Sequence, residues 1–289
     1  GLTMYPSEVM EKYIGVRQDP IYRGFDPLDC MIKEGHKAGI QVHAWFEFGF
    51  SYKNGAAESV WEVKYPHWIG RKPGRRSLEK NGFFWWNALH PKPQQFLREL
   101  ITEVVTKYPV DGVQGDDRLP AMPSEGGYDA YTAELFRREK GKEPPADHLD
   151  PEWVQWRADK LSSFGKSLYK TVKDARPDCL VSWSPSIFPW SKENYLQDWI
   201  QWIEGGYADF VIPQVYRYDY SSYEAEMRKL QAQVRPDLLP RVFPGILTSL
   251  GDGYRIDPAL LEKKVRLNSS LGFKGECFFY FEGFRPKKT

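Results

Sequence analysis

Two adjacent aspartates and an arginine close a short apolar segment, and they are the residues of this chain best suited to chemistry. In "VDGVQGDDR" they are Asp116, Asp117 and Arg118. Neighbouring carboxylates repel each other, so a strand that had only to pack would not end in this way. Carboxyl groups in pairs suit acetal cleavage, in which one protonates the leaving oxygen and another acts as nucleophile or base. The simpler alternative is a turn, which aspartate also favours.

Polar and aromatic residues also end the other strand-like segments. Because alternate side chains of a strand face the same side, the sequence predicts which residues share a face with Asp116. The carboxylates on that face are Glu47 and Glu282, and the choice between them as the second catalytic carboxylate stays open. The expected supporting or substrate-binding residues are Asp117, Arg118, His43, Trp45, Trp86, Asn87, Gln114, Trp183, Gln214, Tyr216, Asp219 and Tyr280.

Strand-like segments alternate with helix-like segments along the chain, which predicts βα units around a parallel sheet. The predicted strands are 40–48, 110–117, 179–185, 208–216, 241–249 and 275–284. The predicted helices between and before them are 26–39, 93–108, 151–175, 193–206, 221–234 and 257–272. A segment of about 49–90, rich in Gly, Lys, Arg and Trp, interrupts this alternation, and no linker is visible. We therefore interpret 1–289 as a single catalytic domain with an insertion on its active-site face.

Six strands are fewer than the eight of a closed (β/α) barrel. An open doubly wound sheet would need a glycine-rich phosphate turn, and the sequence contains neither G-x-G-x-x-G nor G-x-x-x-x-G-K-[ST]. The predicted fold is therefore α/β, a (β/α)8 TIM-type barrel whose first one to two strands are missing from this chain. In such barrels the carboxyl ends of the strands carry the active site.

Composition excludes several classes of function. The net charge of +1 gives no basic field for nucleic acid. The 5 His residues form no zinc-binding spacing, so we expect no metal and no cofactor. No run of 18 apolar residues and no signal peptide is visible, and the 3 Cys form no C-x-x-C pair. The 45 aromatic residues (11 Trp, 17 Tyr, 17 Phe) suit a core plus a sugar-binding groove. Four tryptophans of the insertion could form either a satellite core or a sugar platform: Trp61, Trp68, Trp85 and Trp86.

The segments "QVHAWFEF", "VDGVQGDDR" and "ADFVIPQVY" resemble a bacterial family called glycosyl hydrolase-like 10. Its members carry an "HAWF" or "HAWL" strand, a D-G-[IV]-x-x-D-D strand and an "[IV]-x-P-Q-x-Y" strand in this order. The resemblance implies a (β/α)8 barrel, activity on bacterial cell-wall glycan or a related polysaccharide, and an extracytoplasmic location. It also implies that the six strands are strands three to eight. The position it implies as catalytic is Asp116, and those lining the substrate subsites are His43, Trp45, Gln214 and Tyr216.

The sequence departs from the family at two places. Relatives commonly have Asn where this chain has Glu47, and an aromatic-rich "DDYFYP" where it has "DDRLPAMPSEGGYD".

The sequence leaves three hypotheses of function. The first is a glycoside hydrolase acting on a polysaccharide or oligosaccharide, the second a non-catalytic carbohydrate-binding barrel, and the third a metal-dependent hydrolase on a barrel.

Overall fold

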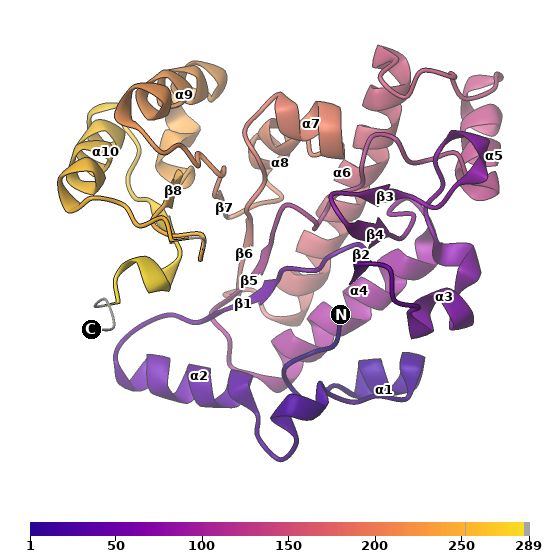
Figure 1. Ribbon diagram of the computed structural model, residues 1–289, viewed down its shortest axis with the longest axis horizontal. Coiled ribbons are helices and arrows are strands. Elements are labelled where there is room, and N and C mark those ends of the chain that lie inside the picture. The colour runs from indigo at the N-terminus through magenta and orange to yellow at the C-terminus, as the bar shows by residue number, and fades with distance from the viewer. Residues whose placement is uncertain (252, 286–289) are drawn as a thin grey trace.

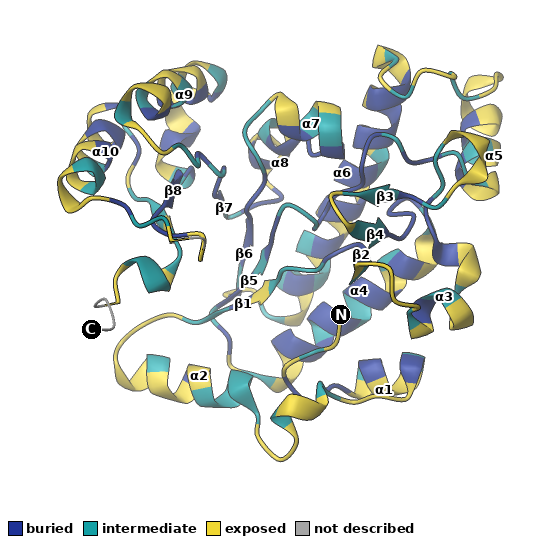
Figure 2. Cartoon of the chain, in the orientation of Figure 1, coloured by how far each residue is buried: buried dark blue, intermediate teal, exposed yellow. Residues whose placement is uncertain are grey.

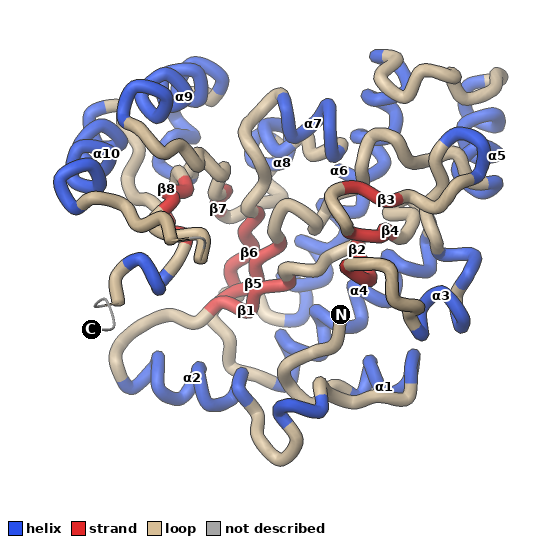
Figure 3. Tube along the Cα trace, viewed as in Figure 1, coloured by secondary structure: helices blue, strands red, loops and turns tan. Residues whose placement is uncertain are grey.

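Parallel strands lie at the centre of the protein, with helices around them (Figures 1 and 3). The computed structural model describes residues 1–251 and 253–285. In it β1 (His43–Phe46), β5 (Gly112–Gly115), β6 (Leu180–Trp183) and β7 (Phe210–Val211) pair in parallel in that order. The strands β8 (Gly245–Leu247) and β9 (Cys277–Phe279) form a second parallel pair, which isolated bridges connect to the β7 segment. Each predicted strand segment contains one of these six strands.

The sheet curves strongly. The ring of His43 on β1 lies 5.9 Å from the ring of Phe210 on β7, measured between centroids. In a flat sheet, strands three places apart would be about 14 Å from each other. The strands therefore form a barrel-type wall, as predicted. Among the described residues β1 and β9 do not pair with each other, so this wall is not a closed ring.

Helices connect the strands and cover the outside of the wall. Figure 2 shows α4 and α6 with buried residues on one face and exposed residues on the other. The helices outside the insertion are α1 (Glu8–Ile14), α2 (Pro27–Lys37), α4 (Pro91–Lys107), α5 (Ala130–Lys140), α6 (Pro151–Ala175), α7 (Trp190–Tyr195), α8 (Trp199–Glu204), α9 (Tyr220–Gln233) and α10 (Pro258–Ser270). The prediction of one helix at 193–206 is wrong, because Leu196 adopts a left-handed conformation (φ 60°) that separates α7 from α8. No helix in the described part of the chain is long and apolar enough to cross a membrane.

The insertion forms a small antiparallel sheet beside the wall, in the order β2-β4-β3. Its elements are β2 (Ser51–Asn54), α3 (Val60–Lys64), β3 (Glu79–Lys80) and β4 (Phe83–Trp85). The side chains of Trp61, Trp68, Trp85 and Trp86 are each 3% exposed or less. Of the two interpretations of these tryptophans, their burial supports the satellite core.

Aspartates fix the starts of two strands. Asp111 precedes β5, and its carboxylate accepts a hydrogen bond of 2.7 Å from the backbone N–H of Val42, just before β1. Asp209 precedes β7 and accepts one of the same length from the N–H of Val181 on β6. Each carboxylate ties its own strand to the neighbouring one, which helps to set the register. That register determines which side chains reach the carboxyl ends of the strands together.

Gly112 leaves room for the ring of His43. A Cβ added at Gly112 would lie 2.5 Å from the Nδ1 atom of His43. We expect Gly112→Ala to lower the free energy of unfolding by about 1–3 kcal/mol, because the crowded wall has to shift. The matched control is Gly165→Ala in α6, where the added Cβ makes only a 3.5 Å contact. The control should gain up to about 1 kcal/mol from helix propensity. Urea denaturation of both variants measures this, and an unchanged Gly112→Ala would contradict the packing argument.

Candidate functional site

Asp116 follows β5 directly and is held by three donors. Its Oδ2 atom accepts a hydrogen bond from Nε1 of Trp45 at 3.0 Å, and its Oδ1 atom accepts one from Nε2 of Gln214 at 2.7 Å. The backbone N–H of Asp117 also donates to Oδ1, at 2.8 Å. The two side-chain donors come from β1 and from the segment after β7, so they reach Asp116 from both sides of the curved sheet. Asp116 is 7% exposed, whereas Trp45 is 51% exposed.

Arg118 brings two further carboxylates to the same place. Its guanidinium forms an ion pair with the carboxylate of Glu47, and its Nη1 atom lies 3.4 Å from Oδ1 of Asp117. It also stacks over the ring of Phe83, 4.3 Å from the centroid. The side chain of Arg118 is 11% exposed, and those of Glu47 and Asp117 are both 37% exposed. The site therefore contains a buried carboxylate beside two partly exposed ones.

Close backbone approaches and a buried glutamine fix the loop of Asp116, Asp117 and Arg118. Gly49 has a φ of 52°, and a Cβ there would lie 2.0 Å from the carbonyl oxygen of Arg118. The side-chain amide of Gln197, which is fully buried, donates to the carbonyls of Asp116 and Pro120, both at 3.2 Å. Sequence reasoning missed Gln197 because it lies inside the segment predicted as one helix, and no local signal marks it.

The pKa values of both aspartates are raised above the ordinary value. For Asp116 the largest cause is burial, followed by the negative charge of Asp117. For Asp117 the cause is burial. Hydrogen bonds from Trp45 and Gln214 act in the opposite direction on Asp116, because they stabilise its ionised form. Since two such close carboxyls titrate as a pair, they keep one proton to a higher pH than isolated aspartates would.

Aromatic rings line the part of the lumen next to the two aspartates. Burial raises the pKa of Tyr216, and the negative charge of Asp116 raises it further. Its ring stacks on Phe279 of β9 with 5.4 Å between centroids. Gln114 lies one alternation before Asp116 on β5, is half-buried, and is in register with Trp45 of β1. Of the residues predicted to lie beside Asp116, the structure brings Trp45 and Gln214 into hydrogen-bond contact with it.

Glu282 is not on a strand. The predicted strand 275–284 ends at Phe279, and Phe281–Gly283 form one turn of 3-10 helix, so the alternation used to direct Glu282 inward does not apply. Its carboxylate binds Arg285 at 2.7 Å and is 41% exposed. Tyr280 lies before this turn and contacts the ring of Phe279. Among the described residues the structure gives Glu282 no contact with the aspartate pair.

Five other predicted site residues are buried in the fold, cap a helix or lie away from Asp116. Trp183 is 2% exposed and donates to the carbonyl of Tyr207, because its position on β6 directs it outward under α8. Trp86 belongs to the satellite core, and Asn87 is buried against Thr132 in the same region. His43 lies in the lumen at the level of Gly112, four residues and about 13 Å before Asp116. Asp219 accepts from the N–H of Ser222 and caps α9. Burial and position thus argue against substrate contact for Trp183, Trp86, Asn87 and His43.

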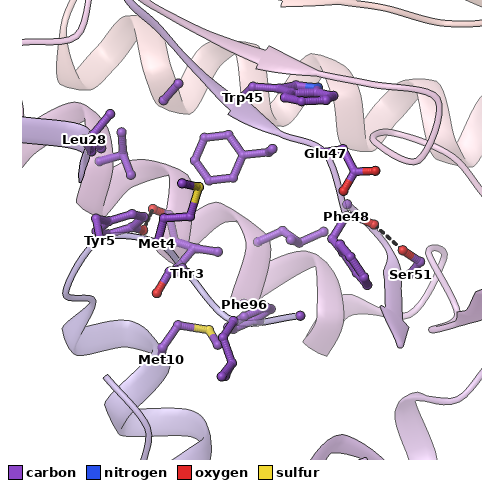
Figure 4. A pocket seen from close by; sticks show the side chains of 18 of the residues that line it. Thr3, Met4, Tyr5, Met10, Leu28, Trp45, Glu47, Phe48, Ser51 and Phe96 are labelled. Atoms are coloured by element: carbon purple, nitrogen blue, oxygen red, sulfur yellow. Dashed lines mark hydrogen bonds between the residues drawn. The ribbon is translucent and has the colours of Figure 1, made fainter. Parts of the chain in front are cut away.

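An apolar cavity of about 530 Å³ lies beside β1, on the side that has no strand partner among the described residues. Figure 4 shows Met4, Tyr5, Met10 and Phe96 around it, with Trp45 and Glu47 at its upper margin. It therefore touches the carboxylate cluster only through those last two residues. Its apolar lining does not provide the polar groups that a sugar needs, so we place the candidate site at the aspartate pair.

Curved parallel strands joined by helices are typical of barrel-type α/β folds, whose active sites lie at the carboxyl ends of the strands. Many glycoside hydrolases also have a pair of carboxylates at their active site. The comparisons agree with this class. The chain belongs to the family described as Glycosyl hydrolase-like 10, whose model matches residues 1–264. The predicted family is thereby confirmed.

Named relatives and solved structures carry related descriptions. Glycosyl hydrolase DigH of Escherichia coli is 26% identical over 317 residues, which cover 94% of this chain and 67% of DigH. Glycosyl hydrolase YngK of Bacillus subtilis is 26% identical over 244 residues, which cover 73% of this chain and 43% of YngK. The PgaB (BpsB) glycoside hydrolase domain from Bordetella bronchiseptica has a TM-score of 0.66 at 19% identity, covering 90% of this chain and 76% of that domain. At 19% identity, the likeness to this solved domain shows a shared fold only.

Proposed function

We propose that the protein cleaves a bacterial polysaccharide, a cell-wall glycan of peptidoglycan type, by acid/base chemistry between paired carboxylates. The observation that carries this proposal is the buried Asp116, clamped by Trp45 and Gln214 beside the partly exposed Asp117. The exposed indole of Trp45 offers a flat apolar face on which a sugar ring can stack next to these carboxyls. The family resemblance supports the cell-wall glycan and an extracytoplasmic location.

The surroundings of each carboxyl suggest its role. Asp116 receives three hydrogen bonds, which favour its ionised form, so it would stabilise positive charge at the sugar carbon or attack it as nucleophile. Burial raises the pKa of both carboxyls, and we assign proton donation to Asp117 because its greater exposure lets it reach the leaving oxygen as general acid. Glu47 neutralises Arg118, which would otherwise lower the pKa of Asp117 and weaken it as an acid.

The experiment that tests the function follows new reducing ends released from peptide-free peptidoglycan glycan strands, with cellulose and starch as comparison substrates. We expect release from the glycan strands. The second candidate function, a non-catalytic carbohydrate-binding barrel, is favoured by the same exposed Trp45 ring. Measurable affinity for the glycan strands with no release over long incubation would support that function and overturn the first.

Glu47→Gln is expected to move the alkaline limb of the pH–rate profile to lower pH. Without the Glu47 carboxylate, the Arg118 guanidinium pairs with Asp117 alone, and a cation that no other carboxylate neutralises lowers the pKa of that carboxyl further. Because the general acid must be protonated, activity would then disappear at a lower pH. The matched control is Glu282→Gln, which breaks an ion pair with Arg285 away from the aspartates and should leave the profile in place. Equal shifts in both variants would contradict the assignment of Glu47.

A further inference from the structure

The loop after β7 presents an exposed aromatic ring at the same end of the wall as Asp116. Tyr218 follows Tyr216 by two residues, and its side chain is 54% exposed. Its ring contacts that of Tyr254 edge-on, with 4.8 Å between centroids and 87° between planes. Tyr254 belongs to the loop after β8, so two successive loops build this aromatic pair. The exposed ring of Tyr218, at the carboxyl ends of the strands, is a candidate surface on which a flat apolar partner can stack.

A buried lysine holds the residue before Tyr218. Lys264 of α10 is fully buried, and its Nζ atom donates to the carbonyl oxygen of Arg217 at 2.6 Å. The ammonium also lies 4.8 Å from the ring centroid of Tyr223. In the part of the chain that the structure describes, it has no carboxylate within ion-pair distance. Burial lowers the pKa of this ammonium group, whereas the charge of Asp219 raises it, and the Arg217 carbonyl accepts its hydrogen bond.

The residue after Tyr218 is fixed as well. Asp219 caps α9 by accepting a hydrogen bond of 2.8 Å from the backbone N–H of Ser222. Tyr218 therefore lies between two anchored neighbours and packs against Tyr254. An exposed ring that is held in this way loses little conformational freedom when a ligand stacks on it, which favours binding.

We propose that Tyr218 is an aromatic subsite for a sugar ring of the polysaccharide, and that Lys264 is the positioning residue that holds it. The subsite lies on the β7 side of Asp116, where Gln214 binds Oδ1, whereas Trp45 binds Oδ2 from the β1 side. Glycan would then extend along both sides of the aspartate pair, and cleavage would occur within the chain. This inference rests on the proposed substrate class.

Binding is measured by calorimetry in the Asp116→Asn background, with peptide-free peptidoglycan glycan strands of two sugars and of six or more. Tyr218→Ala should weaken binding of the long strands roughly threefold to tenfold, the size of one ring-stacking contact, and leave the disaccharide unchanged. Tyr218→Phe keeps the ring and should keep the affinity. The matched control is Tyr131→Ala in α5, which Figure 1 shows on the side opposite α9 and α10 and which should change neither affinity.

Lys264→Met tests the positioning role, with thermal unfolding measured to confirm that the variant is folded. It should reduce affinity for long strands and not for the disaccharide, and it should add nothing when combined with Tyr218→Ala. Tyr218→Ala binding the long strands as tightly as its parent would overturn the subsite, and additive losses would overturn the role of Lys264. Binding of the strands without cleavage by the unaltered protein would refute the hydrolase and leave the subsite standing. Failure of any strand to bind would refute the glycan class and this inference with it.

Discussion

Asp116→Asn is expected to reduce the release of reducing ends from glycan strands by at least about 10³-fold. The negative charge of Asp116 stabilises the positive charge that develops on the sugar in the transition state, and a neutral amide cannot do so. The amide also disturbs the clamp, because its NH2 group would face a donor where the carboxylate now accepts from Trp45 or Gln214. The variant should remain folded, since it removes a buried charge whose pKa is raised by desolvation.

The matched control for this prediction is Asp111→Asn at the other end of the same strand. Asp111 binds the N–H of Val42 and the ring of His36, so its replacement perturbs the fold without reaching the lumen rim. We expect this control to lose some stability and to keep activity within about twofold at temperatures well below its unfolding. Activity is measured by reducing ends and folding by circular dichroism. Full activity in folded Asp116→Asn would remove Asp116 from the mechanism.

Local periodicity predicted the centre of the site. Strand side chains alternate with a period of two, so the faces of Trp45, Gln114 and Asp116 follow from the sequence as soon as the strands are recognised. Gln214 lies beyond the end of the short β7, yet its extended segment is bridged to Gly245 and it still reaches Asp116. Val113, which alternates with these residues on β5, is 4% exposed. The register between parallel strands then brings these side chains to one rim.

What the sequence could not predict depends on contacts between distant segments. The same alternation failed for Glu282 because the last strand ends at Phe279, and nothing local marks that end. Glu47 was placed near Asp116, but its partner Arg118 lies 71 residues away in sequence. Gln197 was invisible because Leu196 breaks a segment whose helical pattern is continuous. In each case packing against another segment decides the backbone or the partner.

Asp117→Asn is expected to slow cleavage of glycan strands by about 10²- to 10⁴-fold, the usual contribution of a general acid. The loss should be much smaller on an aryl glycoside of the same sugar, because a phenolate with a low pKa leaves without being protonated. In the unaltered protein the rate should fall as pH rises through the raised pKa of the pair, since the acid is active only when protonated. With the aryl glycoside, Asp117→Asn should lose that alkaline decline.

The two substrates also separate this role from a structural one. Asp117 lies next to Arg118, and its backbone N–H donates to Asp116, so a substitution that merely displaced the loop would damage Asp116 as well. Such damage would reduce cleavage of the aryl glycoside and of the glycan strands by the same factor and would leave the pH profile unchanged. Equal losses would therefore refute proton donation by Asp117.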